Sequence, residues 1–511
     1  MRTLLLALAA CNVSNAAPAA KVSDVPTDKE SQSLTAELQK MNGSDYGKPA
    51  AKWTAGTVTP KEAPAAKKTK LGFEIKFGNA SAVSTPAVYQ GKLYTSGGFN
   101  SRELFAYDST TGKAAFGLAL SDDGPSSIAC DDGTCAFNTE SCTTFAIDSR
   151  TGKARWAWFL GDPQTSSPSI AGGRVFTTYP GGAVEGNKAR PPGASHVLAA
   201  FDLATGKVVW QDWLDADVIS APVAVGEFLY VSTFNGTVIK LEQATGKIRY
   251  ASKAHATSAP VVQFDHGLET AWYTRRADQI ATPAAAPASS APKKAKAEEQ
   301  IVRTDHNEPQ EKYSTPAKSA DYLDGEVQDK AEMKGKAAKS DAGNGFSGGA
   351  PAAAAPHKAM AQVGQSNVAT IQQFQGSRIL HVQNMNVNTM GDEVIATNSD
   401  DGKQVWSHKL SGDMKKDGGF LGAPPISAGN HLIVATLHGM VLELDPKTGK
   451  VEHSWDVGGT LRSQPVADNG WIYVGTDDGR LVAIDSGDRT VTGWPMWGGN
   501  AQRTGIGTTT K

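Results

Sequence analysis

Apolar and small residues alternate in a short pattern that recurs along the chain. In its clearest copy, residues 144–156, Phe145 and Ile147 alternate with small residues as they do in a half-buried strand. Residues 148–152 include the Asp, Ser, Thr and Gly that are typical of tight turns, and Trp156 follows the turn at a fixed offset. The pattern predicts a strand, a tight turn and the start of a second strand.

Six further copies keep the same order of strand, turn and aromatic residue. Their turns begin at Asp108, Asp202, Glu242, Asn398, Asp445 and Asp485. The spacing is 40 residues from Asp108 to Asp148, from Asp202 to Glu242 and from Asp445 to Asp485. A repeat of about 40 residues with several short strands is typical of a four-stranded propeller blade.

The repeats predict an all-β fold, a single β-propeller of seven four-stranded blades. Eight blades are the alternative, if part of the N-terminal tail contributes strands. Because a closed ring has to hide its two free edges, we expect a first strand at residues 73–77 to join the last repeat.

The Ala-x-Asp-x-x-Thr-Gly-Lys-x-x-Trp pattern at residues 146–156 resembles the pyrroloquinoline-quinone (PQQ)-type propeller repeat. Quinoprotein dehydrogenases share this repeat with the propeller lipoprotein of the outer-membrane β-barrel assembly machinery. The resemblance covers residues 71–505 apart from one long insertion. It implies a propeller and leaves the function open between a redox enzyme and a binding scaffold.

Four tryptophans close copies of the repeat: Trp156, Trp210, Trp406 and Trp455. They could form a binding stripe, but their periodic placement favours a role in docking each blade against its neighbour.

The N-terminus has the features of a secretory signal. Met1 and Arg2 precede a short apolar run that cannot span a bilayer. The run ends in Leu-Ala-Ala-Cys11, which resembles a bacterial lipobox, so we expect residues 1–16 to be a signal sequence with lipobox and Cys11 to be a lipid anchor. The alternative is ordinary cleavage at the small residues 14–16, which gives a secreted or soluble periplasmic product. Both interpretations place the chain outside the cytoplasm.

Two segments have the composition of disorder. Residues 17–70 and 276–369 are rich in Ala, Pro, Lys and other polar residues and poor in large apolar ones. Such segments bury too little surface to offset the entropy of ordering them. We expect a disordered N-terminal tether and a disordered insertion within the propeller.

The cysteines suit an oxidising compartment. Cys130 and Cys135 flank a two-residue hairpin with Asp132-Gly133 at its tip, so they face each other on neighbouring strands and are expected to form a disulfide. The pairing of Cys142 stays open.

No motif for catalysis emerges from the sequence. The chain has no phosphate loop, dinucleotide fingerprint or zinc-protease motif, and its formal net charge of −2 does not suggest a nucleic-acid partner. Quinoprotein dehydrogenases commonly hold PQQ against an adjacent Cys-Cys pair, with calcium bound by Glu and Asn. No adjacent pair exists here, and no loop suggests the calcium set. We therefore expect no catalytic residue, cofactor or metal ligand.

The sequence predicts a non-catalytic scaffold on the periplasmic face of the outer membrane. It would bind protein partners and attach to the membrane through its lipid, with a role in outer-membrane protein assembly as one model. The alternative is a quinoprotein dehydrogenase that uses PQQ with calcium.

Overall fold

The computed structural model describes residues 28–50, 53–140, 143–161, 166–276, 299–305, 379–417 and 421–507, apart from 255, 257, 266 and 267. Cys11, Cys142, the expected signal sequence and nearly all of the expected insertion lie outside these residues. Within them, no helix is long and apolar enough to cross a membrane.

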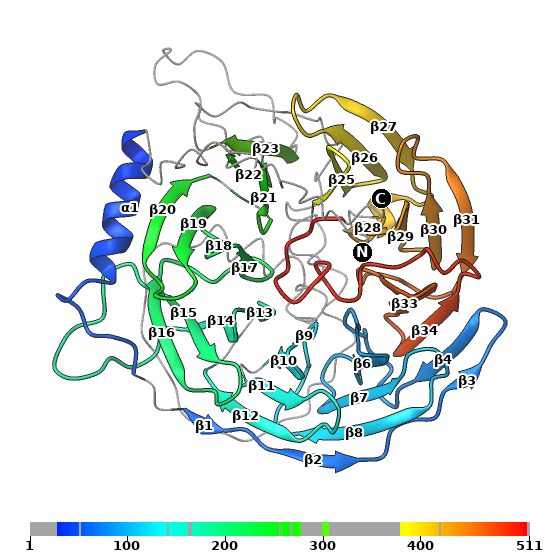
Figure 1. Ribbon diagram of the computed structural model, residues 1–511, viewed down its shortest axis with the longest axis horizontal. Coiled ribbons are helices and arrows are strands. Elements are labelled where there is room, and N and C mark those ends of the chain that lie inside the picture. The colour runs from blue at the N-terminus through cyan, green and yellow to red at the C-terminus, as the bar shows by residue number, and fades with distance from the viewer. Residues whose placement is uncertain are drawn as a thin grey trace, which may run out of the picture.

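Eight antiparallel sheets stand around a common axis, which makes the fold a β-propeller (Figure 1). Blades 1 to 4 contain β5 (Ala87–Tyr89), β6 (Lys92–Ser96), β7 (Glu103–Asp108) and β8 (Ala114–Leu120); β9 (Ala129–Asp131), β10 (Thr134–Asn138), β11 (Thr143–Asp148) and β12 (Ala154–Phe159); β13 (Ser169–Ala171), β14 (Arg174–Pro180), β15 (His196–Asp202) and β16 (Val208–Leu214); and β17 (Val223–Val225), β18 (Phe228–Ser232), β19 (Thr237–Glu242) and β20 (Ile248–Lys253). Blades 5 to 7 contain β21 (Val261–Asp265), β22 (Leu268–Arg276) and β23 (Glu299–Asp305); β24 (Leu380–Val382), β25 (Met385–Met390), β26 (Glu393–Asn398) and β27 (Gln404–Lys409); and β28 (Ile426–Ala428), β29 (His431–Ala435), β30 (Met440–Leu444) and β31 (Val451–Asp456). Blade 8 contains β32 (Val466–Asp468), β33 (Trp471–Gly475), β34 (Arg480–Asp485) and β4 (Gly72–Lys76). A four-residue helix, α5 (Met414–Asp417), follows β27.

The predicted all-β propeller is confirmed. Seven sheets have at least four strands, and each contains one of the seven repeats. The eighth blade comes from β21–β23, which carry no copy of the repeat, and not from the N-terminal tail. β23 also lies within the insertion expected to be disordered, where it pairs with β22.

The ring closes as expected from the sequence. β4, from the N-terminal side of the chain, pairs with β34 of the last repeat, so blade 8 combines strands from both ends of the propeller. This pairing satisfies the backbone groups that an open ring would leave at its two ends.

In most repeats the turn is held by its acidic residue. In blade 2, Asp148 Oδ1 accepts hydrogen bonds from the backbone nitrogen of Thr151 at 2.9 Å and from its hydroxyl at 2.8 Å. The hydroxyl bond is the main cause that lowers the pKa of Asp148. The same pairing recurs between Asp108 and Thr111, between Asp202 and Thr205, and between Asp445 and Thr448.

Aromatic side chains fit against the turn glycine of the next blade. The pairs are Phe73 with Gly112, Phe116 with Gly152, Trp156 with Gly206, Trp210 with Gly246, and Trp406 with Gly449. A Cβ atom on any of these glycines would lie 2.4–2.9 Å from the ring, and their φ angles of 67–75° also favour glycine.

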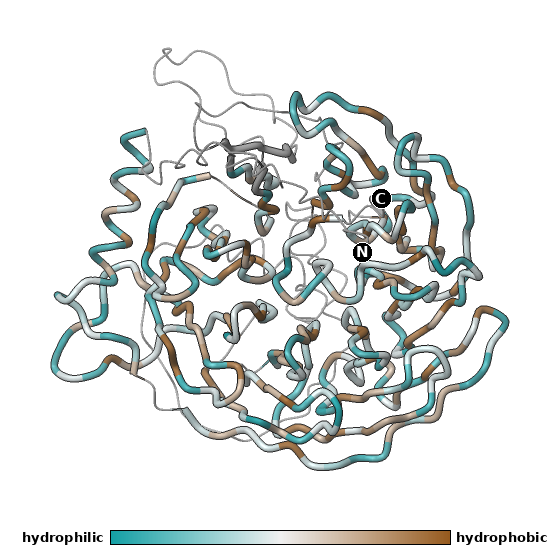
Figure 2. The backbone as a smooth tube through the Cα atoms, in the orientation of Figure 1, coloured by the Kyte–Doolittle hydropathy of each residue, from teal (hydrophilic) through white to brown (hydrophobic). Residues whose placement is uncertain are grey.

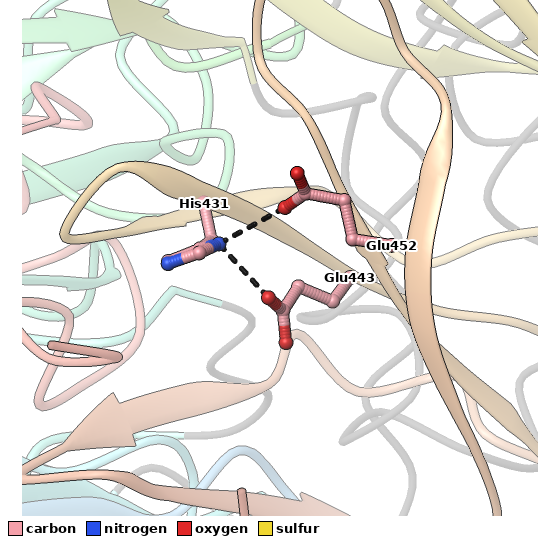
Figure 3. Close-up of side chains that lie close together, drawn as sticks. All are labelled: His431, Glu443 and Glu452. Atoms are coloured by element: carbon pink, nitrogen blue, oxygen red, sulfur yellow. Dashed lines mark hydrogen bonds and ion pairs between the residues drawn. The ribbon is translucent and has the colours of Figure 1, made fainter. Parts of the chain in front are cut away.

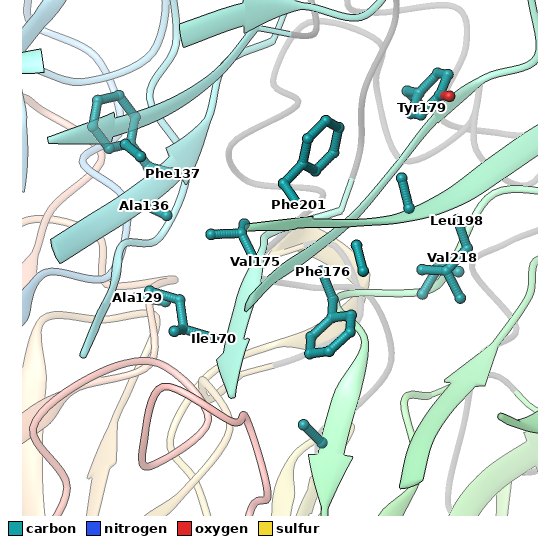
Figure 4. Packing of buried hydrophobic residues seen from close by; sticks show 14 of the residues in the cluster. Ala129, Ala136, Phe137, Ile170, Val175, Phe176, Tyr179, Leu198, Phe201 and Val218 are labelled. Carbon is teal, nitrogen blue, oxygen red and sulfur yellow. The ribbon is translucent and has the colours of Figure 1, made fainter. Parts of the chain in front are cut away.

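The docking tryptophans are also hydrogen-bonded across the junction. Trp156 Nε1 donates to the Leu203 carbonyl at 3.0 Å, and Trp210 Nε1 donates to the Gln243 carbonyl at 2.8 Å. Apolar side chains of neighbouring blades fill the space between sheets; Figure 4 shows Phe137 of β10, Phe176 of β14 and Phe201 of β15.

The C-terminal segment, residues 494–507, runs across the inner strands at the axis (Figure 1). Ile170 N of β13 donates to the Ala501 carbonyl, and Ala224 N of β17 donates to the Gln502 carbonyl. The fully buried Arg503 donates to the carbonyls of Ser127 and Pro168, so it joins blades 2 and 3. The chain itself therefore occupies the axis of the ring.

Residues 28–50 and 53–70, expected to be part of a disordered tether, instead form a belt around the rim of blades 4, 3, 2, 1 and 8. The belt consists of α1 (Lys29–Met41), β1 (Thr54–Ala55), β2 (Val58–Lys61) and β3 (Lys67–Lys68), together with their connections (Figure 1). α1 and its surroundings are largely hydrophilic, whereas apolar stretches concentrate on the strands inside the ring (Figure 2). The prediction of disorder was wrong for the described part of this segment because Leu38 and Met41 of α1 are buried in the hydrophobic core, Trp53 packs against three aromatic rings, and hydrogen bonds add to this burial.

Two sets of hydrogen bonds illustrate the polar part of this attachment. Thr35 Oγ1 of α1 accepts from Ala251 N of β20 at 2.9 Å. Asn42 pairs with both backbone groups of Trp213 in β16: its Oδ1 accepts from Trp213 N at 2.7 Å, and its Nδ2 donates to the Trp213 carbonyl at 3.1 Å.

The belt also places Lys48 3.6 Å from the carboxylate of Asp212 on β16. Burial raises the pKa of Asp212 to about 6, and the Lys48 ammonium acts in the opposite direction.

We predict that Trp156→Ala lowers the free energy of unfolding by about 3–5 kcal/mol, because the variant loses the packing against Gly206. Trp156→Phe should cost less, since it keeps a ring and loses mainly the hydrogen bond to Leu203, worth about 1 kcal/mol. Urea unfolding measures both values, with the exposed Val209→Ala as a control. Equal stabilities for the alanine variant and the parent chain would refute the docking role.

A second prediction concerns pH. An unfolded Asp ionises near pH 3.9, while the pKa of Asp212 in the fold is about 6. The folded state therefore binds more protons between these values, and the contribution of Asp212 to the free energy of unfolding decreases as the pH rises from about 4 to about 6.

Asp212→Asn removes this decrease. We compare the free energy of unfolding of the variant with that of the parent chain, both measured by urea unfolding. The variant value minus the parent value should rise by about 1–3 kcal/mol between pH 4 and pH 7. Lys48→Met should move the decrease to higher pH, because the ammonium that lowers the pKa is lost. A stability difference that is constant with pH would contradict the assignment.

Candidate protein interface at the rim

The belt covers the outer edges of five blades. β1 pairs with β12 and β2 pairs with β8, so the outermost strands of blades 2 and 1 each gain a further strand. β3 does the same for β4 in blade 8. In blades 4 and 3, α1 and Asn42 lie against the outer strands β20 and β16.

Among the four-stranded sheets, two outer strands beyond the belt have no partner strand in the described part of the chain. β27 of blade 6 and β31 of blade 7 each end their sheet. Both present an exposed apolar side chain: Val405 on β27 is 48% exposed and Val451 on β31 is 43% exposed. Unpaired edge strands are templates for pairing with another chain. These neighbouring six-residue strands are the candidate interface and are called the open edges below.

The remaining site residues expected from the sequence are dispersed over the ring. Cys130 and Cys135 are joined by a disulfide between β9 and β10, with their Cα atoms 4.1 Å apart. Trp156, Trp210 and Trp406 are buried at three different blade junctions. Of the site residues expected from the sequence, only Trp406 and Trp455 lie on the open edges.

Blade 7 departs from the repeat. The strand register pairs Glu443 with His453, as it pairs Ala396 with Trp406 in blade 6. His453, not Trp455, thus stands at the position of the docking aromatics; Trp455 lies two residues later and is half-buried. The spacing from the turn glycine to the docking residue carried this signal in the sequence, but the nearby tryptophan obscured it.

A cluster of His and Glu side chains occupies the same part of blade 7 (Figure 3). His431 Nδ1 of β29 lies 2.8 Å from Glu443 Oε1 of β30 and 3.2 Å from Glu452 Oε2 of β31. These three ligand atoms all lie within 4.8 Å of one another, and this is the one such group of potential metal ligands among the described residues. Sequence reasoning missed the cluster because its members are distant in the chain and match no spacing motif.

Comparison with known proteins identifies the family. The family model described as outer membrane protein assembly factor BamB matches residues 53–191, 183–384 and 390–500, well over half of the chain. The chain belongs to the BamB family. The match includes β1 and β2 of the belt and the residues on both sides of the expected insertion. No curated protein matches the chain significantly.

Solved structures give weaker matches. The crystal structure of BamB from Moraxella catarrhalis is 13% identical, with 84% of this chain and 97% of that chain covered and a TM-score of 0.49. The computationally designed Ika8 protein is 11% identical, with 80% and 98% covered and a TM-score of 0.45. At these scores neither structure bears on function.

Proposed function

We propose that this chain is a non-catalytic scaffold of the cell envelope that binds protein partners during outer-membrane protein assembly. The observation that carries the proposal is the match to the BamB family along nearly the whole propeller. A rigid ring suits such a role, because it holds binding surfaces in fixed relative positions without a moving part.

The open edges supply the binding surface in this proposal. An extended segment of a partner can add as a further strand to β27 or β31, where main-chain hydrogen bonds provide affinity and neighbouring side chains provide specificity. The outer edges of blades 8 and 1 to 4 are less suitable, since β1, β2, β3, α1 and Asn42 already lie against them. The axis is less suitable as well, because residues 494–507 cross it.

Membrane attachment through Cys11 completes the proposal. The lipobox-like sequence that ends at Cys11 would place the propeller on the periplasmic face of the outer membrane. The family match supports this location, because the described function of the family is at that membrane.

The alternative, a quinoprotein dehydrogenase, rests on the shared repeat alone. The cysteines are at positions 11, 130, 135 and 142, so the chain lacks the adjacent pair of that class. Cofactor absorbance and dye reduction after addition of PQQ and calcium to the purified protein would favour the alternative.

Capture of partners tests the binding surface. We expect the tagged chain to retain subunits of the outer-membrane assembly machinery from cross-linked envelopes, measured by quantitative mass spectrometry. Val405→Lys combined with Val451→Lys should reduce capture at least about tenfold, because charges on an edge strand disfavour the addition of another strand.

Val209→Lys provides a matched control. Val209 occupies the same bulge position of β16 as Val405 does of β27, and it is 43% exposed, but β16 lies under the belt. The control should capture as much as the parent chain, and all variants should unfold within about 0.5 kcal/mol of it. Equal capture by the double variant and the control would reject the open edges as the interface, and absence of assembly subunits would reject the function.

The lipid anchor has its own test. Labelled fatty acid should enter the parent chain, and Cys11→Ser should lose the label and move from the membrane fraction to the soluble fraction. A Cys11→Ser variant that stays on the membrane would show that a protein partner or another segment is the anchor.

A further inference from the structure

The junction between blades 7 and 8 lacks the docking contact found at other junctions. In blade 7, His453 replaces the aromatic residue, and its side chain is 70% exposed. On the blade 8 side, the position four residues after Asp485 is Arg489, so this turn lacks the glycine that Gly206 and Gly449 each present to a tryptophan ring. Apolar side chains of both blades share one cluster here, and the Arg480 guanidinium donates to the carbonyls of Val457 and Gly458, so other contacts take the place of the aromatic–glycine contact.

The same junction contains a buried carboxylate. Glu443 stands at the position that is alanine in four other repeats, namely Ala106, Ala146, Ala200 and Ala396. Its side chain is only 4% exposed, yet its Oε1 atom points toward His431 and lies 3.5 Å from His453 Nδ1. A buried carboxylate is costly unless positive charge or hydrogen bonds compensate for it.

Negative groups outnumber the imidazoles around Glu443. Glu452 lies 3.2 Å from His431 Nδ1, and Asp488 of blade 8 lies 3.7 Å from His431 Nε2. Three carboxylates thus face two imidazoles, an arrangement that a divalent cation would neutralise.

The geometry suits a small cation with nitrogen and oxygen ligands. In a tetrahedral zinc site with ligands at about 2.0–2.1 Å, the ligand atoms lie about 3.3 Å apart. The distances from His431 Nδ1 to the two glutamate oxygens are 2.8 and 3.2 Å. An imidazole ligand favours zinc over the harder magnesium and calcium ions, which prefer oxygen ligands alone.

The surroundings of His431 fit this role as well. Histidines that bind zinc through one ring nitrogen usually direct the other toward a carboxylate or carbonyl, which fixes the ring. His431 Nε2 faces Asp488, and Asp488 is itself held by the backbone nitrogen and the hydroxyl of Thr490, each at 2.8 Å. This arrangement would couple the ligands of blade 7 to the turn of blade 8.

We propose that His431, Glu443 and Glu452 bind a zinc ion that braces blade 7 against blade 8, with His453 or water as the fourth ligand. Glu452 is 40% exposed, so the site is open to solvent and an ion can enter it in the folded protein.

The test uses the full chain after treatment with a chelator and its removal. Isothermal titration with zinc chloride should show one site per chain, and zinc should raise the melting temperature. His431→Ala and Glu452→Gln should each weaken zinc binding at least about tenfold. Glu452→Gln is the decisive variant if His431→Ala does not fold, because Glu452 is partly exposed and forms no part of the core.

His408→Ala, a change to a histidine of β27 outside the cluster, is the matched control and should bind zinc as the parent chain does. No zinc binding by the parent chain, or binding that Glu452→Gln leaves unchanged, would overturn the proposal. Because the measurement needs no partner protein, its outcome is independent of the scaffold function.

Discussion

The contact between an aromatic side chain and the turn glycine of the next blade is the constraint on which the ring depends. The aromatic ring lies where a Cβ atom would otherwise be, so a turn with any other residue would hold the two blades further apart. The Nε1 bonds from Trp156, Trp210 and Trp406 to carbonyls of the next blade also fix the rotation between sheets. The Asp–Thr hydrogen bonds keep each turn in the shape that offers its glycine to the neighbour.

A ring built in this way still has edges, and the two ends of the chain cover most of them. β4 closes blade 8, and the belt pairs with or packs against the outer strands of five blades. Residues 494–507 join inner strands at the axis, where Arg503 connects blades 2 and 3 through backbone carbonyls. Among the outer strands of the four-stranded sheets, β27 and β31 are left without such cover in the described structure. A scaffold that keeps most edges closed restricts strand addition to a defined part of its rim.

The sequence predicted the features that depend on local periodicity. The spacing of the turn residues gave the seven repeat-containing sheets, and the need to hide two edges gave the pairing of β4 with β34. The blade formed by β21–β23 was missed because it lacks the Asp-Thr-Gly turn. The belt was missed because residues 17–70 are polar on average, which hides the few apolar side chains that reach the core, such as Leu38 and Met41. Thr35 and Asn42 add hydrogen bonds to backbone groups far away in sequence. The cluster at His431, Glu443 and Glu452 depends on strand register across three strands, which no spacing in the sequence displays.

The central claim is that partners bind at the open edges of blades 6 and 7. Amide hydrogen exchange of the free chain and of its complex with a captured assembly subunit tests this claim most directly. Binding by strand addition should slow exchange in residues 404–409 or 451–456, while amides of β8 and β12 under the belt should change little. Slower exchange confined to the belt side of the rim, with β27 and β31 unchanged, would contradict the account.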